Sequence, residues 1–166
     1  MATQQVEMVG ANSDELRWTG GATDTQLRLD PPAHGRLLAS LSPATADPLA
    51  GPDRVFLNVE NVRGSLDAVA FDVYLNLPHG AEPAHYPELL AGHVALFGVR
   101  KASLPQGEHA GNGVTYVLDV THVIDALHLA QALSGTQLQV SLVPLQPVPE
   151  AAQVRIGRIS LYRQSG

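Results

Sequence analysis

The sequence predicts an all-β fold, either an antiparallel β-sandwich or a partly closed barrel of about 6–8 strands with one short helix. Short runs in which apolar and polar residues alternate follow one another closely along the chain. The 15 Gly and 12 Pro supply many turn positions between these runs. Helices that alternate with strands, as in a βαβ fold, are not visible in the pattern. At 166 residues the chain has the length of one domain.

The first 24 residues are polar and Gly-rich, and we expect them to form a loosely held opening segment. A single β-sandwich domain is then expected over residues 25–166. Residues 25–29 alternate as a strand, which the pair Pro31-Pro32 would end. Residues 39–53 are rich in Ser, Pro, Ala and Asp, and this composition indicates a long surface loop.

From residue 54 onward the alternation becomes regular, and residues 71–77 are the clearest period-2 run. Thr121 is expected to cap the one helix, which would run to about residue 133. The glycines of residues 107–113 predict a hairpin turn, and Gly157 marks a slip in the alternation that is typical of a bulge. The strands expected after residue 54 are 54–60, 71–77, 93–99, 114–120, 137–145 and 154–162.

Composition excludes several classes of function. Without cysteine the chain has no disulfide, no thiolate metal site and no Cys nucleophile. The net charge of −6 is scattered, with no run of Lys or Arg for phosphates, so we expect no nucleic-acid partner. No window approaches the roughly 20 apolar residues of a membrane span, and residues 1–10 do not resemble a signal peptide. We therefore expect a soluble chain without a membrane partner, and the compartment stays open.

The seven histidines suggest a metal site, but their spacing argues against one. His122 and His128 are the only pair on the expected helix, and six residues place them roughly 240° apart around it. His79, His85 and His93 fall in or beside a loop and are expected to be surface side chains. We therefore expect no metal ligand set in this chain.

No catalytic residue is expected either. A Gly-x-Ser-x-Gly nucleophile elbow is absent. Asp72 and Asp119 lie on strands among apolar neighbours and could oppose each other as in a glycosidase, but carboxylates in such positions more often cap turns or pair with Arg. Phe56, Tyr74 and Val117 put apolar side chains on the second face of their strands, which indicates that this face is covered too.

The run Phe71-Asp72-Val73-Tyr74, with Asn76 two residues later, resembles the Lys-Phe-Asp-Val-Tyr-x-Asn signature of the C-terminal domain of plant polyphenol oxidases. Ala70 takes the place of the signature Lys. The order of the surrounding strands also matches, and the ending at residues 155–159 is similar to the Ile-Gly-Gly-Ile ending of these domains. The resemblance covers nearly the whole chain.

This resemblance implies a non-catalytic C-terminal cover domain of a bacterial tyrosinase-like polyphenol oxidase. Copper would belong to a separate catalytic domain, the expected partner, which oxidises mono- and diphenols. The cover would keep that domain latent and stabilise it by placing a side chain over the dicopper pocket. Tyr86, with His85 beside it, is the expected plug.

A freestanding β-sandwich module that binds a carbohydrate or a partner protein is the alternative. An exposed row of aromatic side chains would favour sugar binding. Trp18 is the only Trp, and the tyrosines are dispersed along the chain.

Overall fold

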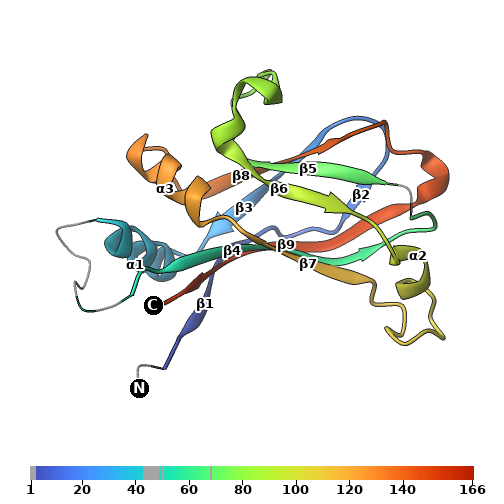
Figure 1. The fold of residues 1–166 in the computed structure, drawn as a ribbon, viewed down its shortest axis with the longest axis horizontal. Coiled ribbons are helices and arrows are strands. Elements are labelled where there is room, and N and C mark those ends of the chain that lie inside the picture. The colour runs from blue at the N-terminus through green and yellow to red at the C-terminus, as the bar shows by residue number, and fades with distance from the viewer. Residues whose placement is uncertain (1–2, 43–48, 50, 68) are drawn as a thin grey trace.

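A single antiparallel sheet carries the fold in a computed structural model of the chain, which describes residues 3–42, 49, 51–67 and 69–166 (Figure 1). Three α-helices and three short 3-10 helices lie at the ends of strands in this part of the chain. The strands are β1 Val6–Ala11, β2 Leu16–Trp18, β3 Thr23–Leu29, β4 Arg54–Arg63, β5 Ala70–Leu75, β6 Leu90–Ala95, β7 Val114–Asp119, β8 Gln137–Pro144 and β9 Val154–Gln164. The helices are α1 Pro31–Leu41, α2 Val99–Ala102, α3 Thr121–Leu129, η1 Pro83–His85, η2 Pro87–Leu89 and η3 Glu150–Ala152.

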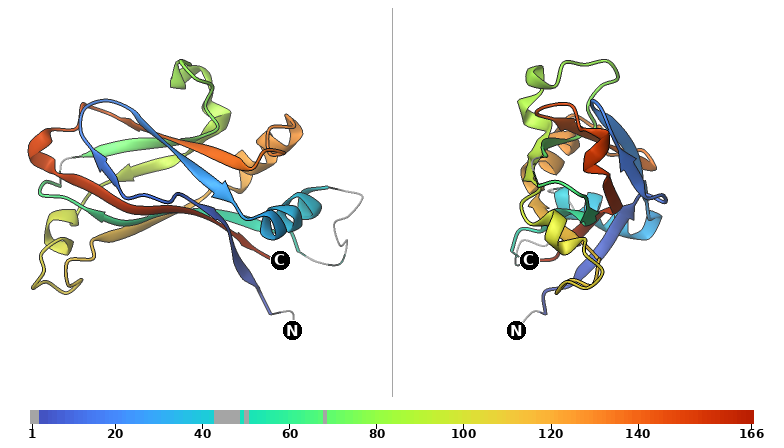
Figure 2. Two further views of the ribbon diagram at one scale, coloured as in Figure 1. Left: turned by 180° about the vertical axis from the view of Figure 1, so that it is seen from behind. Right: turned by 90° about the vertical axis from the view of Figure 1, so that its right-hand side faces the viewer.

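The sheet curls into a nearly closed barrel. Its strands follow the order β6-β5-β8-β3-β1-β9-β4-β7. The short strand β2 pairs with the N-terminal end of β9. The two end strands, β6 and β7, approach each other without pairing: a Cβ added to Gly92 of β6 would lie 3.0 Å from Leu118 of β7. Figure 2 shows the flattened barrel from behind and from one end. The all-β antiparallel class predicted from the sequence is confirmed, with nine strands and three α-helices in the described part.

One continuous apolar core fills the barrel because the inward positions of each strand are apolar. Along β4 the side chains of Val55, Leu57 and Val59 are almost fully buried, as the period of two predicts. Phe71 of β5 packs edge-to-face against Trp18 of β2, with ring centroids 5.1 Å apart. This aromatic pair joins one of the shortest strands to the centre of the core.

The N-terminal segment differs from the expectation. Residues 1–24 contain β1 and β2, and β1 lies between β3 and β9 inside the sheet. The expectation that this segment is loosely held is therefore wrong for residues 6–18. The alternation is weak here because a bulge between Met8 and Gly10 interrupts the register of β1. A Cβ on Gly10 would lie 2.7 Å from the carbonyl oxygen of Arg28, so this position requires glycine.

Pro31-Pro32 begins a helix that the sequence prediction missed. Asp30 is the N-cap of α1, and its carboxylate accepts a hydrogen bond of 3.2 Å from the backbone N–H of Ala33. Prolines are tolerated in the first turn of a helix because its first N–H groups have no partner within the helix. The predicted loop over residues 39–53 overlaps the end of α1, and residues 43–48 and 50 of it lie outside the described residues.

The connections around β7 also differ from the prediction. Helix α3 ends at Leu129 rather than near residue 133, and Gln131 beyond it has a φ of 56°. Thr121 does not cap α3: its hydroxyl donates to Asp119 at 2.6 Å and accepts from the backbone N–H of Val55. The glycines at 107–113 do not form a hairpin turn, because β6 and β7 are not paired and α2 lies between them. The alternation slips near Gly157 as predicted, since Ile156 and Ile159 are both buried, but β9 keeps one register with β4 there. The register shift lies in β4 against β7, between Val59 and Val62, where Asn61 has a φ of 53°.

Candidate cover surface around the projecting loop

The motif that carries the resemblance lies on β5, in the half of the sheet formed by β6, β5 and β8. Phe71, Val73 and Leu75 point into the core and are at most 1% exposed. β5 pairs with β8 on one side and with β6 on the other. The apolar half of the motif therefore supports the barrel and is not available to a ligand.

The polar half of the motif faces outward. Asp72 is paired in register with His93 of β6, and its carboxylate accepts a hydrogen bond from Nδ1 of His93. The His93 side chain is 74% exposed and that of Asp72 is 21% exposed. This pair ties the end strand β6 to β5 on the surface of the barrel.

Tyr74 shares the outward face with Asp72 but is only 7% exposed. Burial is the main factor that raises the pKa of its hydroxyl, and the carboxylates of Asp72 and Glu82 raise it further. Glu82 belongs to the loop after β5, so this loop lies near Tyr74. The expectation that the second face is covered holds at Tyr74, whereas Val117 on β7 is 60% exposed.

Asn76 turns the chain out of β5. Its φ is 55°, a left-handed conformation that Asn tolerates better than most residues. Its backbone N–H donates to the carbonyl of Gln139 at 2.8 Å, so the turn is fixed to β8. The Asn of the motif thus sets the direction in which the next segment leaves the barrel.

That segment, the projecting loop of residues 78–89, stands out from the barrel between β5 and β6 (Figure 1). It is built from the two 3-10 turns η1 and η2, which meet at Tyr86. The backbone N–H of Tyr86 donates to Pro83, and its carbonyl accepts from Leu89, both at 3.0 Å. Two consecutive turns with three prolines give the loop a defined shape.

The two predicted plug residues differ in exposure. His85 is exposed on the projecting loop, and no hydrogen bond of its ring is found among the described residues. Tyr86 is half-buried and packs against the core of its own domain. The structure thus brings both residues to one loop, and of the two side chains it leaves His85 more open to a partner.

The histidines do not gather into a metal centre in the part of the chain that the structure describes. There, no three side chains of His, Asp or Glu are placed so that they could hold a metal ion. His34 bonds to the carbonyl of Leu133 at 2.6 Å, and His122 lies 3.3 Å from that of Leu90. Together with the His93–Asp72 pair, these contacts give three of the histidines structural partners.

Asp119 has a structural partner as well. Its carboxylate accepts hydrogen bonds from the Thr121 hydroxyl and from Arg54, which hold the pKa below its usual value although burial opposes this. Asp72 is bonded to His93. Asp119 therefore pairs with an Arg, as the sequence favoured, whereas Asp72 pairs with a histidine.

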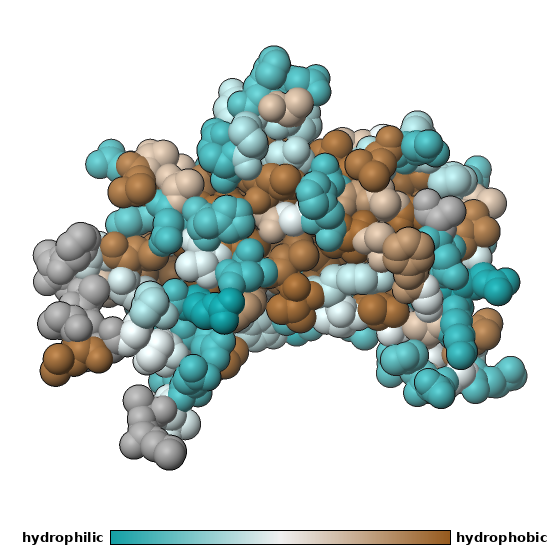
Figure 3. All heavy atoms as spheres, in the orientation of Figure 1, coloured by the Kyte–Doolittle hydropathy of each residue, from teal (hydrophilic) through white to brown (hydrophobic). Residues whose placement is uncertain are grey.

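An apolar band lies on the same side of the molecule as the projecting loop. In Figure 3 it crosses the middle of the face over β6 and β7, between the hydrophilic projecting loop and the hydrophilic segment after α2. Exposed apolar side chains on these elements include Val117 on β7, at 60%, and Phe97, which follows β6, at 79%. The alternation along the sequence points to Val117 but not to Phe97.

The backbone at Phe97 is held in place, although the Phe97 side chain is exposed. Its neighbours Leu96 and Val99 are fully buried, and its own N–H donates to Ala95 at 2.9 Å. Gly98 has a φ of 77°, which ends β6 and turns the chain into α2. A fixed backbone lowers the conformational entropy that is lost when an exposed side chain is bound. The sequence signal that could have identified Phe97 is its position directly before Gly98, at the end of a strand.

Trp18 is unavailable for stacking on a sugar, because it is 2% exposed and its indole N–H donates to the carbonyl of Gly21 at 2.7 Å. This weakens the carbohydrate-binding alternative. No helix within the described residues has both the length and the apolar character needed to cross a membrane.

Comparison with known proteins agrees with the resemblance. A tyrosinase of Hahella sp. is 26% identical over 161 residues, which are 96% of this chain and 33% of that relative. Two solved structures of latent aurone synthase, a polyphenol oxidase, share the fold. One has a TM-score of 0.52 over 87% of this chain at 18% identity, and the other has 0.50 over 90% at 12% identity. This chain covers 25% of each solved chain.

The chain therefore spans about a third of the length of the curated tyrosinase that it matches, and the resemblance to this oxidase family is confirmed. The family model described as "Domain of unknown function (DUF7868)" matches residues 5–164. Since this match includes almost every residue of the barrel, the chain belongs to the DUF7868 family.

Proposed function

We propose that this domain covers and regulates the dicopper active site of a tyrosinase-like catalytic domain, without being an enzyme itself. The observation that supports this most strongly is the match of 161 residues with a third of a tyrosinase. The remaining two thirds of that relative leave room for a separate catalytic domain. In this proposal copper and phenol oxidation belong to that catalytic domain, and this chain supplies the cover.

The projecting loop and the apolar band are the surface that we assign to the cover. The band offers exposed apolar side chains, Val117 and Phe97, beside a hydrophilic loop. An apolar centre with a polar rim is the usual composition of a protein–protein interface. A side chain on the loop, His85 or Tyr86, would then occupy the mouth of the copper pocket.

The physical basis of latency is competition. A side chain held next to the pocket at high effective concentration excludes a phenol even when its own affinity is weak. Loosening or cleaving the connection between the two domains lowers this effective concentration, and the pocket opens. The same contact would stabilise the catalytic domain, because binding to the folded state favours that state.

The test is to add this chain to its cognate tyrosinase catalytic domain and to measure catechol oxidation. The rate should fall with increasing chain concentration and reach a plateau, and the two proteins should co-elute in size-exclusion chromatography. An unchanged rate together with separate elution would contradict the proposed function.

The plug is tested by four variants of the added chain. His85→Ala and Tyr86→Ala should relieve the inhibition while the complex still forms, whereas His109→Ala, outside the projecting loop, should inhibit like the unchanged chain. Relief by Phe97→Ala alone would contradict the assignment of the plug to the projecting loop and would leave the cover role in place.

A further inference from the structure

Three arginines lie side by side on the outer face of the barrel. In the register of the antiparallel strands, Arg155 of β9 is opposite Arg17 of β2 on one side and opposite Arg63 of β4 on the other. Directly paired residues of antiparallel strands point to the same face. Neighbouring strands are about 5 Å apart, so this arginine row extends over roughly 10 Å.

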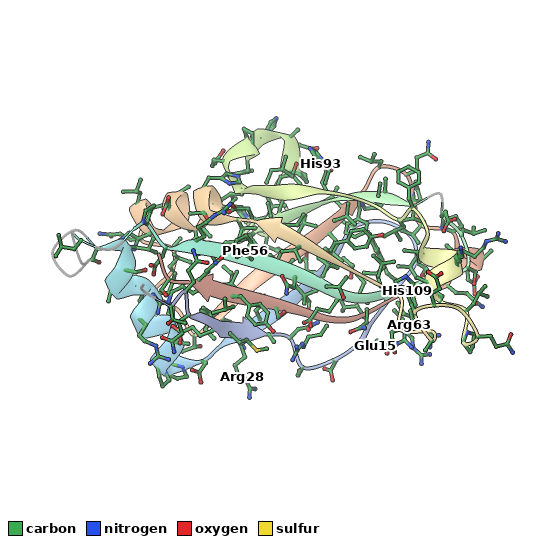
Figure 4. The ribbon with its side chains drawn as sticks, turned by 60° about the horizontal axis from the view of Figure 1, so that its bottom comes forward. Glu15, Arg28, Phe56, Arg63, His93 and His109 are labelled. Atoms are coloured by element: carbon green, nitrogen blue, oxygen red, sulfur yellow. The ribbon has the colours of Figure 1, made fainter. Side chains whose placement is uncertain are left out.

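The charge of the arginine row is mostly uncompensated. Arg63 pairs with Glu15 at 3.2 Å, while Arg17 and Arg155 form no ion pair among the described residues. The Nε of Arg63 is buried and has no hydrogen-bond partner there. Figure 4 shows Arg63 and Glu15 together at this end of β4.

Like charges directly opposite each other in a sheet are destabilising. The row nevertheless holds three of the chain's 10 Lys and Arg residues, in a protein whose net charge is −6. Elsewhere in the described structure, arginines such as Arg158 and Arg163 face carboxylates. The row therefore concentrates positive charge where folding alone gives no reason for it.

A hollow of about 500 Å³ adjoins the row. Arg17 and Arg155 line it, together with Trp18, Thr19, Glu150 and Gln153. Thr19 adds a hydroxyl that can donate. Among the described residues that line the hollow, Glu150 alone carries a carboxylate, and it makes no ion pair with either arginine. Two guanidinium groups and one carboxylate leave the hollow positively charged.

We propose that the arginine row and this hollow bind a soluble multivalent oxyanion that carries phosphate or sulfate groups. The guanidinium group donates in a planar fork that matches two oxygens of such a group. Arginines at successive strand spacings can each bind a different oxygen of the same anion. The bound charge would offset the repulsion between Arg17 and Arg155, the two arginines that line the hollow. This site does not depend on the proposed cover role.

The experiment titrates the whole chain with inorganic pyrophosphate and follows binding by isothermal titration calorimetry at constant ionic strength. We expect saturable binding at one site. Arg155→Gln should weaken it by about tenfold or more, since hydrogen bonds to charged groups are the strong ones. Arg28→Gln is the matched control: Arg28 is an exposed strand arginine apart from the row (Figure 4), with Ala11 and Gln137 as its register partners.

Thermal unfolding separates the site from general attraction of anions. Without pyrophosphate, Arg155→Gln should unfold at the same temperature as the unchanged chain or at a higher one, because the variant relieves repulsion. With pyrophosphate, the unchanged chain and Arg28→Gln should gain stability, and Arg155→Gln should gain much less. Absence of saturable binding, or equal weakening by Arg28→Gln and Arg155→Gln, would overturn the proposal.

Discussion

At the scale of single residues, the motif of β5 that carries the family resemblance is mainly structural. Phe71 and Val73 are core side chains, Asp72 bonds to His93, and Asn76 adopts the left-handed conformation that ends the strand. None of these contacts provides reactive chemistry. The motif identifies the fold because it combines a buried strand with the turn from which the projecting loop departs.

The ion pair between Glu60 and Arg158 on the outer face of the barrel predicts how the stability of the domain depends on pH. Glu60 accepts hydrogen bonds from Arg158 at 2.7 and 3.0 Å and from the Ser160 hydroxyl at 2.7 Å. These bonds hold its pKa below the usual value of 4.5, although burial opposes them. A lowered pKa in the folded state stabilises the protein above the pKa of the unfolded chain, and this contribution is lost as the pH falls through the folded pKa.

Glu60→Gln should therefore lower the free energy of unfolding by about 1 kcal/mol at pH 7. The difference from the unchanged chain should shrink as the pH falls from 4.5 through the lower pKa of the folded state, because below that pKa the carboxylate of Glu60 is neutral in the unchanged chain too. Urea unfolding of both proteins at a series of pH values measures this difference in the free energy of unfolding. Glu108→Gln, at an exposed position in the loop before β7, is the control and should differ little at any pH. A difference for Glu60→Gln that does not vary with pH would contradict the assignment.

At the scale of elements, the most instructive departure is helix α1. The Pro pair after residue 29 was read as the end of a strand, and it is also the beginning of a helix. Both statements are compatible, because proline ends a strand ladder and fits the first turn of a helix equally well. The signal that distinguishes the two is Asp30, a good N-cap residue directly before the prolines.

Asp30→Ala should destabilise the domain by about 1 kcal/mol through loss of the cap. Asp30→Asn should retain most of the stability, because Asn caps helices about as well as Asp. Chemical denaturation of the three proteins provides the measurement. If Asp30→Ala and Asp30→Asn lost equal amounts of stability, the charge of Asp30 rather than its cap geometry would be what stabilises α1.

At the scale of the whole molecule, the N-terminal strands complete the barrel. β1 bridges β3 and β9, and Val9 and Trp18 are buried in the common core. Without β1 the inner edges of β3 and β9 would lose their partners, and unpaired strand edges expose backbone donors and acceptors. The domain therefore includes the segment that the sequence pattern assigned to a loose opening.

Deletion of residues 1–24 should consequently abolish the cooperative fold, since it removes two strands and part of the core. Deletion of residues 1–3 is the control and should leave the fold intact, because β1 begins at Val6. Circular dichroism and thermal unfolding of both truncated chains measure the effect. A folded, cooperatively melting 25–166 fragment would show that the boundary expected from the sequence was right.

The sequence by itself determined the fold class, the strands after residue 54 and the resemblance to the oxidase family. These features depend on local alternation and on contiguous residues such as Phe71 to Asn76, which are readable along the chain. Only the tertiary structure decided that β1 is central, that β6 and β7 close the barrel, and that Arg17, Arg155 and Arg63 stand in one row. Register places Arg155 beside Arg17 and Arg63, each more than 90 positions away along the chain, and no local pattern encodes which distant strands become neighbours.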